Sequence, residues 1–188
     1  MPKSPAANLG AAVAKVSVNG ELISLLITTY RQFVLNEIPP RKFYAMNIRE
    51  ASIEQRAAII ALLQSQGLPT RDLPLSLQDF YVAQEEEKLV GLIGMERYGQ
   101  FGLLRSMVVH PDYRNRHIAE RLVQMLEEKG AASGLLAMYL LTETAENYFT
   151  RKGYTKVDRD AVPASVKASS EFSHVCPVSA TVMKKEFS

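Results

Sequence analysis

Hydrophobic and polar positions follow a clear pattern from residue 41 onward. Residues 43–48 alternate, which predicts a strand. A helix is expected next, with Ser52 as its N-cap and Gly67 as its end. Its apolar stripe would consist of Ile53, Ala57, Ile60, Ala61 and Leu63.

Most of the remaining apolar segments predict strands. They are expected at 80–83, 89–95, 101–109, 135–141, 154–157 and within 175–183. The continuous apolar run at 135–141 is typical of a strand that is buried on both faces. Residues 68–78, which contain two prolines, and residues 160–172 are expected as loops.

Two further helices complete the pattern. Residues 115–129 predict an amphipathic helix closed by Gly130, and residues 144–152 predict a short helix ended by Gly153. The apolar face of the first would consist of Ile118, Leu122, Val123 and Leu126. The element order β-α-β-β-β-α-β-α-β-β predicts an α/β (α+β) domain with a mixed, mostly antiparallel sheet of six to seven strands, flanked by helices.

The first 40 residues are expected to form an N-terminal extension. Residues 21–36 have helical spacing, although Asn19-Gly20 is also a hairpin signal. Pro39-Pro40 marks a boundary before the main domain, residues 41–188. The extension would cover an edge strand or form the contact of a homodimer.

Composition narrows the class of protein. A formal net charge of +2 without a long Lys/Arg block does not favour a nucleic-acid partner. No apolar run approaches the roughly 20 residues that span a bilayer, so no membrane role is expected. The single Cys176 excludes an intrachain disulfide framework and indicates the cytoplasm. Three scattered histidines predict no metal site.

The segment 103–119 carries the strongest chemical signal. A strand ending at Val109 leads through a turn into a basic loop, Arg114–Arg116, and then into a helix. The first N–H groups of a helix lack intrahelical partners, and the positive end of its dipole favours anions. This order of elements predicts a site for a phosphorylated, nucleotide-type ligand.

The same segment resembles the cofactor motif of the GNAT superfamily of acetyl-CoA-dependent N-acetyltransferases. The matching residues are Val109, Pro111, Arg114 and Ala119, and the resemblance extends over about residues 43–185. It implies the GNAT fold, acetyl-CoA as the donor and an amine as the acceptor. His117 stands where the family has glycine, which allows close backbone approach to the pyrophosphate.

Later segments are similar to two subgroups. Residues 140–145, 153–154, 162–163, 171–172 and 176–180 resemble N-acetyltransferases associated with arsenic resistance. The strand LLRSMVV and residues 141–145 are also similar to the acetyltransferase domains of N-acetylglutamate synthases. Both resemblances imply direct acetyl transfer, in a ternary complex, to a small amino-acid-like amine. Direct sensing of arsenite by one cysteine is not expected.

The resemblance also implies which residues bind acetyl-CoA. Backbone groups of the strand would hold the acetyl and pantetheine parts, and the loop and helix start would hold the phosphates, with Arg114 and Arg116 as guanidinium partners. The expected cofactor-binding residues are Met107, Val108, Val109, Arg114, Asn115, Arg116, His117, Ile118 and Ala119.

Candidate catalytic residues come from the strand ends. Glu96 or Glu143 would take the acceptor's proton. The family often has, where this chain has Phe149, a tyrosine that protonates the departing CoA thiolate. Tyr148, beside it, is the candidate for this general acid. Either carboxylate is also compatible with a simple hydrated loop position.

Two polar residues are candidates for contact with the acceptor. Arg105 interrupts an apolar strand and needs a partner, which would be Glu96 or a substrate carboxylate. Strand alternation places it on the same face as Met107. Thr142 would cap the following helix or contact substrate.

Two other functions remain open. One is a degenerate family member that binds CoA as a sensor or interaction module, an alternative that His117 and Phe149 favour. The other is a protein acetyltransferase for lysines or N-termini.

Overall fold

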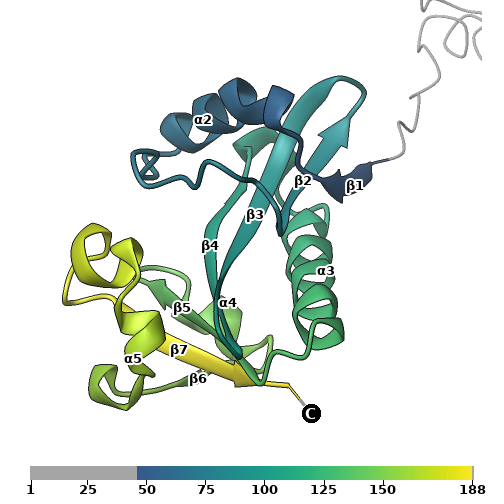
Figure 1. The fold of residues 1–188 in the computed structure, drawn as a ribbon. Coiled ribbons are helices and arrows are strands. Elements are labelled where there is room, and N and C mark those ends of the chain that lie inside the picture. Colours follow the sequence, from purple (N-terminus) through teal and green to yellow (C-terminus); the bar gives the residue numbers. More distant parts are fainter. Residues whose placement is uncertain (1–45, 188) are drawn as a thin grey trace, which may run out of the picture. The chain divides into compact units, whose positions relative to one another are not determined.

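The computed structural model describes residues 46–187 (Figure 1). The predictions made for residues 1–40 and the start of the strand at 43–48 lie outside these residues. The strands are β1 (Asn47–Glu50), β2 (Phe80–Glu85), β3 (Lys88–Tyr98), β4 (Phe101–Val109), β5 (Ala137–Thr142), β6 (Thr155–Lys156) and β7 (Thr181–Glu186). The α-helices are α2 (Arg56–Ser65), α3 (Ile118–Ala132), α4 (Glu146–Thr150) and α5 (Ala164–Lys167).

The seven strands form one sheet in the order β1-β2-β3-β4-β5-β7-β6. Every neighbouring pair is antiparallel except β4 and β5, which are parallel. The predicted mixed, mostly antiparallel sheet flanked by helices is therefore confirmed.

Helices cover both faces of this sheet (Figure 1). On one side, here called the α3 face, Ile118, Leu122 and Leu126 of α3 pack with Phe149 of α4. On the other, the α2 face, α2 covers β2 to β4 and α5 covers β4, β5 and β7. The two faces of the sheet thus have separate cores, and a site between the strands can connect them.

The start of α2 shows why one predicted helix face was wrong. Residues Ile53–Gln55 form a turn of 3₁₀-helix, which has three residues per turn, before α2 begins. Ser52 is the N-cap of this turn, and its N–H donates to Gln55 Oε1 at 3.0 Å, whereas the N-cap of α2 itself is Gln55. Ile53 is consequently 57% exposed, and the helix buries Ile59, Leu62 and Leu63.

The end of α3 also differs from the prediction. The helix passes through Gly130 to Ala132, and the turn out of it uses Gly134, which has a φ of 77°. A Cβ added at Gly130 would lie 3.0 Å from Phe187 and 3.3 Å from Met138. Gly130 therefore permits close packing of α3 and does not end it.

The C-terminal region contains more helical structure than expected. In place of a loop at 160–172 the chain forms the 3₁₀ turn Arg159–Ala161, α5 and a π-helical turn, η4, at Glu171–Val175. The last strand accordingly begins later than predicted, at Thr181. Among the described residues, no helix is long and apolar enough to cross a bilayer.

Candidate active site

A cavity opens where β4 and β5 separate. The two parallel strands pair only from Phe101 opposite Ala137 to Leu103 opposite Tyr139. Beyond Leu103, the edge of β4 toward β5 has no strand partner in the described part of the chain. The resulting cavity of about 660 Å³ is lined from the α3 face by α3 and α4, and from the α2 face by residues 66–69 and 171–177.

A β-bulge in β4 determines which side chains face each end of this cavity. Leu92 pairs with Val108 and Gly94 pairs with Arg105, so β4 contains one extra residue there. Ser106 lies in this bulge with a φ of 56°. Such bulges re-aim side chains and are frequent next to active sites.

The bulge corrects the predicted position of Arg105. Strand alternation predicted Arg105 and Met107 on one face, but the extra residue places them on opposite faces. Met107 and Val109 pack against the α3-face core, whereas Arg105 pairs with residues of the α2 face. One strand therefore presents different chemistry to the two ends of the cavity.

The α3-face end of the cavity adjoins the basic loop. A second cavity of about 650 Å³ shares Val109, Arg114, Ala119 and Tyr148 with the first. Asn115 and His117 both have left-handed backbone conformations, with φ of 60° and 56°. The first N–H groups of α3 and these turns produce the concave arrangement of donors that suits phosphate.

The two predicted phosphate-binding arginines have different positions. Arg114 lines both cavities, and its guanidinium donates to Gln66 Oε1 at 2.9 Å and to the Val109 carbonyl at 3.3 Å. Arg116 lines neither cavity, pairs with Glu85 and stacks over the Tyr113 ring. The geometry thus supports Arg114 but does not place Arg116 at a phosphate.

His117 turns its side chain outward. The ring is 81% exposed, and its Nδ1 lies 2.9 Å from Glu120 Oε2. The residue begins α3 in the conformation that favours glycine, which gives a physical reason for the glycine common at this position. Its backbone N–H remains in the loop that lines the second cavity.

Tyr148 and Phe149 are adjacent in sequence but lie in different surroundings. Phe149 is buried in the α3-face core, with its ring against Tyr154. Tyr148 lines both cavities, and its buried hydroxyl has no hydrogen-bond partner among the described residues. Burial, with smaller contributions from Glu120 and Glu127, raises the pKa of Tyr148 to about 12.

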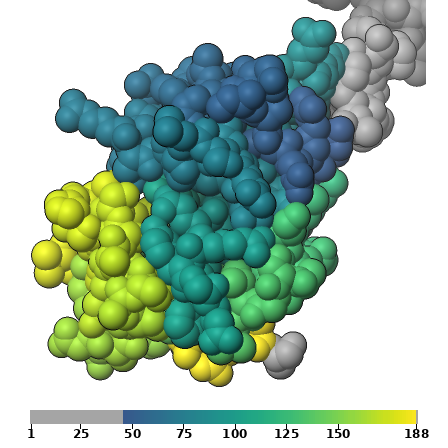
Figure 2. All heavy atoms as spheres, in the orientation of Figure 1, coloured from purple at the N-terminus to yellow at the C-terminus, as the bar shows by residue number. Residues whose placement is uncertain are grey.

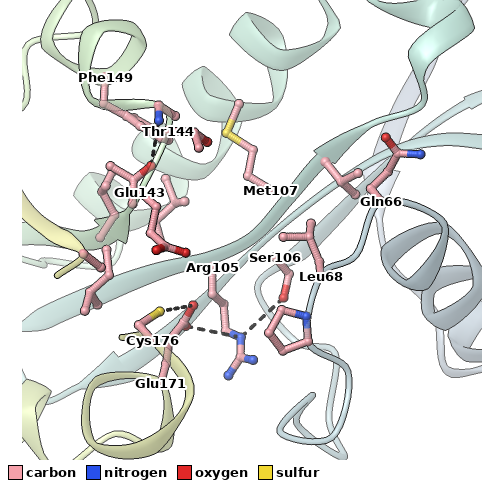
Figure 3. A pocket seen from close by; sticks show the side chains of 18 of the residues that line it. Gln66, Leu68, Arg105, Ser106, Met107, Glu143, Thr144, Phe149, Glu171 and Cys176 are labelled. Carbon is pink, nitrogen blue, oxygen red and sulfur yellow. Dashed lines mark hydrogen bonds and ion pairs between the residues drawn. The ribbon is translucent and has the colours of Figure 1, made fainter. Parts of the chain in front are cut away.

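The α2-face end contains a buried arginine, Arg105, that pairs with three carboxylates, of which Figure 3 shows Glu171. Arg105 is only 4% exposed, and it donates to Asp72 at 2.6 Å and to Glu96. The expected pairing of Arg105 with Glu96 is therefore present. A third carboxylate, Glu171 Oε2, lies 3.6 Å from its Nε.

Asp72 reaches this cluster through the loop after α2. Arg56 of α2 donates to the carbonyls of Leu73 and Pro74, and Leu73 is buried. The loop 68–78 is thereby fastened against the α2 face. In the space-filling view, the blue segment that contains α2 and the yellow segment that contains η4 both border the teal strands (Figure 2).

Neither predicted catalytic carboxylate both lines the cavity and is shielded from solvent, as Glu171 is. Glu96 does not line the 660 Å³ cavity, and besides Arg105 it accepts a hydrogen bond from the Tyr98 hydroxyl at 2.5 Å. Glu143 lines the cavity but is exposed. Thr142 also lines it, and its Oγ1 accepts the Ala145 N–H at 2.9 Å, as a cap.

Sequence reasoning did not select Glu171. It lines the cavity from η4, together with Cys176, whose Sγ lies 3.9 Å from Glu171 Oε1 (Figure 3). Burial raises the pKa of the Cys176 thiol to about 11, so the thiol is protonated and a poor nucleophile at neutral pH. The pair Glu171-Phe172 belonged to a subgroup resemblance, which was the one available signal.

Comparisons with known proteins bear on the same region. Residues 76–156 match the profile of the acetyltransferase (GNAT) domain. The amino-acid acetyltransferase of Escherichia coli (strain K12) is 28% identical over 132 residues, which cover 65% of this chain and 30% of that protein. That of Serratia proteamaculans (strain 568) is 25% identical over 133 residues, with 66% and 30% coverage. The match thus spans less than a third of these relatives' length.

Solved structures show the same fold. N-acetylglutamate synthase from Neisseria gonorrhoeae, complexed with coenzyme A and N-acetyl-glutamate, has a TM-score of 0.64 and 18% identity, covering 76% of this chain and 35% of that one. A GNAT-family acetyltransferase from Staphylococcus aureus MU50 has a TM-score of 0.62 and 18% identity, with 77% and 100% coverage. The predicted GNAT fold is confirmed, and the domain match agrees with the expected acetyltransferase class.

Proposed function

We propose that the chain is an N-acetyltransferase that moves an acetyl group from acetyl-CoA directly to the amine of a small amino-acid-like acceptor. The observation that carries the proposal is the cavity between β4 and β5, which connects the two faces of the sheet. Two substrates that enter from opposite faces meet at the bulge in β4. Such positioning of two reactants is the main requirement of direct transfer.

The α3-face end fits the acetyl donor. The free edge of β4 at residues 107–109 offers backbone groups to the acetyl and pantetheine parts. Residues 115–119 supply backbone N–H groups to the phosphates, and Arg114 supplies a guanidinium at the junction of both cavities. Arg151 and Lys152 add positive charge to the same cavity.

The α2-face end would take the acceptor. Thr142 and Glu143 line the cavity at and just after the end of β5, and Arg105 supports the wall of the α2-face end. Tyr148, which lines both cavities, would protonate the departing thiolate. Because the pKa of Tyr148 is raised to about 12, the hydroxyl keeps its proton at neutral pH and remains able to donate it.

Two measurements on the full chain test this proposal. Calorimetry should show that acetyl-CoA binds, and thiol detection should show CoA release when single amino acids and simple amines are added. The chain's similarity to amino-acid acetyltransferases supports testing glutamate and other amino acids first. Lack of binding would reject the proposal, and so would lack of turnover with every amine.

A degenerate member that binds CoA without transfer is the second candidate. Phe149 favours it, because its buried ring supplies no proton to a leaving thiolate. The two candidates differ in one result: binding without CoA release across the panel would support the second. A protein acetyltransferase would release CoA only with peptides.

Narrower parts of the proposal rest on sequence. The resemblance of residues 171–172 and 176–180 supports an association with arsenic resistance, and the single cysteine supports a cytoplasmic enzyme. We also propose a homodimer without nucleic-acid or membrane partners, which sedimentation of the full chain would test. Deletion of the chain's gene should lower resistance to an amine-bearing arsenical if that association is correct.

A further inference from the structure

Given the proposed acetyltransferase activity, on which this inference rests, the geometry points to Glu171 as the catalytic base that deprotonates the acceptor's ammonium group. Glu171 lies in the wall of the cavity, on the α2 face where the acceptor would enter. It belongs to none of the segments whose chemistry the sequence motif describes. Its position is set by the C-terminal turn η4.

The carboxylate is buried but incompletely paired. Only 14% of its side chain is exposed. Oε2 is buried without a hydrogen-bond partner among the described residues, and its nearest cation is Arg105 Nε at 3.6 Å, beyond hydrogen-bond range. A buried acceptor atom without a donor carries a desolvation cost, and an acceptor ammonium in the cavity would supply the missing donor.

The backbone around Glu171 is held in an unusual conformation. The Ser169 Oγ accepts the Phe172 N–H at 3.1 Å, and Ser169 is buried. The Cys176 N–H donates to the Glu171 carbonyl at 2.9 Å and closes the π-type turn. Single π turns are rare and occur frequently at functional sites.

Titratable groups from four parts of the chain face this carboxyl. Arg105 comes from β4, Asp72 from the loop after α2, Glu96 from β3 and Cys176 from the segment after η4. Glu143 lines the same cavity from the loop after β5. The positive charge of Arg159 lowers the pKa of Cys176, against the larger effect of burial, and the Tyr98 hydroxyl donates a hydrogen bond to Glu96. The cluster of one guanidinium and three carboxylates has excess negative charge, which favours a cationic amine at its open side.

The pKa of Glu171 agrees with the role of a base. Burial raises it to about 7, and although Arg105 opposes this shift, Asp72 and Glu96 add to it. Near neutral pH a substantial fraction of the carboxyl is therefore ionised and able to accept a proton. A base is most efficient when its pKa lies close to the working pH.

The proposed step balances as follows. The Glu171 carboxylate takes one proton from R–NH3⁺, and the freed nitrogen lone pair forms the C–N bond to the thioester carbonyl carbon. The C–S bond then breaks, and its electron pair leaves with sulfur. A second nitrogen proton is lost as the thiolate is protonated, directly or through Tyr148. The products are the acetamide, the CoA thiol and the proton that Glu171 returns to solvent.

The other two candidates differ from Glu171 in ways that an experiment can use. Both oxygens of Glu96 accept hydrogen bonds, from Arg105 and from Tyr98, so neither is free for substrate. Glu143 is exposed and has no ion pair among the described residues. The matched substitutions are therefore Glu171→Gln, Glu143→Gln and Glu96→Gln.

Steady-state kinetics across pH should separate these roles, with an amine that the wild-type chain acetylates. Glu171→Gln should lower kcat by about 100-fold or more and abolish the acidic limb of the pH profile, with the acetyl-CoA Kd unchanged. Glu143→Gln should keep the acidic limb of the pH profile, and Glu87→Gln, at an exposed carboxylate outside both cavities, should keep kcat within about threefold of wild type. Glu96→Gln should shift the acidic limb to lower pH, because it removes a negative charge that raises the Glu171 pKa.

A second readout needs no acceptor. The folded state binds a proton at Glu171 more tightly than the unfolded state does, so rising pH should cost stability between the unfolded pKa near 4.5 and the folded value of about 7. The urea midpoint of wild type should fall across this window relative to that of Glu171→Gln. Folding of the variant is checked in the same experiment.

Three outcomes are distinguishable. If wild type acetylates an amine while folded Glu171→Gln keeps kcat within threefold and the same acidic limb, the role of Glu171 is overturned and the proposed function stands. If wild type binds acetyl-CoA but acetylates nothing, the proposed function fails and the base fails with it. Loss of kcat and of the acidic limb in Glu171→Gln alone supports the inference.

Discussion

The two ends of the cavity are built by opposite means. The α3-face end is built mostly from one continuous stretch, from β4 through the loop to the start of α3, with Tyr148, Arg151 and Lys152 added from α4 and the residues after it. The α2-face end is assembled from β3, β4, the loop after α2 and the turn η4, and it consists of buried side-chain charges. These charges lie up to a hundred residues apart in sequence, between Asp72 and Glu171.

This difference separates a general function from a specific one. Backbone donors at a helix start bind any phosphate, so the α3-face end suits a donor that many acetyltransferases share. Buried side chains in a fixed arrangement discriminate strongly, because an ill-fitting acceptor leaves them unpaired. The identity of the acceptor should therefore depend on Glu171 and Arg105, which line the cavity, and Asp72 and Glu96 should act on it only by holding Arg105. The substitutions below test the contrast.

Arg105→Ala should have the largest effect. It would leave Asp72, Glu96 and Glu171 without their shared cation, and breaking a buried ion pair from one side costs about 3–5 kcal/mol. Urea unfolding at neutral pH should show this loss of stability. The loss should shrink at acidic pH, because the remaining carboxyls can then be protonated and no longer repel one another.

Arg114→Ala is the matched control from the other end. Arg114 is exposed, so its removal should change the free energy of unfolding by no more than about 0.5 kcal/mol. Equal losses in the two variants would contradict the contrast between a buried charge cluster and an exposed phosphate loop.

The same contrast explains what the sequence could predict. The segment 103–119 was predicted as an anion site because its residues are contiguous, and because a strand, a basic loop and a helix start bind anions through local geometry. Glu171 and Asp72 were missed because only folding brings them to Arg105. Strand periodicity also placed Arg105 beside Met107, since an extra residue at Ser106 leaves no periodic trace.

The predictions that rested on local signals agree with the structure better than those that depended on distant residues. Residues 101–109 were predicted with the bounds of β4, because a short apolar run between turns is a local signal. Arg116 was predicted as a phosphate partner, but in the structure it pairs with Glu85 of β2, 31 residues away in sequence. Local signals thus predicted the sheet, whereas long-range pairs such as this one leave no local trace in the sequence.

Tyr148→Phe should have the next largest effect, at the meeting point of the two ends. Its buried hydroxyl has no hydrogen-bond partner within residues 46–187, so the substitution should leave stability unchanged or slightly higher. With the proton donor removed, kcat should fall by about 100-fold while the acetyl-CoA Kd stays constant. Tyr113→Phe, in the second cavity alone, is the control and should keep kcat; equal rates for both variants would remove Tyr148 from the reaction.

Arg114→Ala should have a smaller effect, confined to the donor. Removing one charge-assisted contact to phosphate should weaken acetyl-CoA binding by about tenfold, with little change in the acceptor's KM. Arg116→Ala is a close control, because Arg116 pairs with Glu85 and lines neither cavity. Its acetyl-CoA Kd should change by about twofold at most. The reverse order, measured by calorimetry, would reassign the phosphate contact to Arg116.

His117→Gly should have the smallest effect and tests how far the donor end depends on backbone alone. Glycine removes about 1 kcal/mol of left-handed strain at φ 56°, but it also gains freedom in the unfolded chain. Stability should therefore change by less than about 1 kcal/mol. The acetyl-CoA Kd should stay within about threefold, because the ring points to Glu120 and the N–H is retained. Asn115→Gly, at φ 60°, is the matched control. A tenfold gain in affinity for His117→Gly alone would mean that the ring, and not only the backbone, shapes the phosphate site.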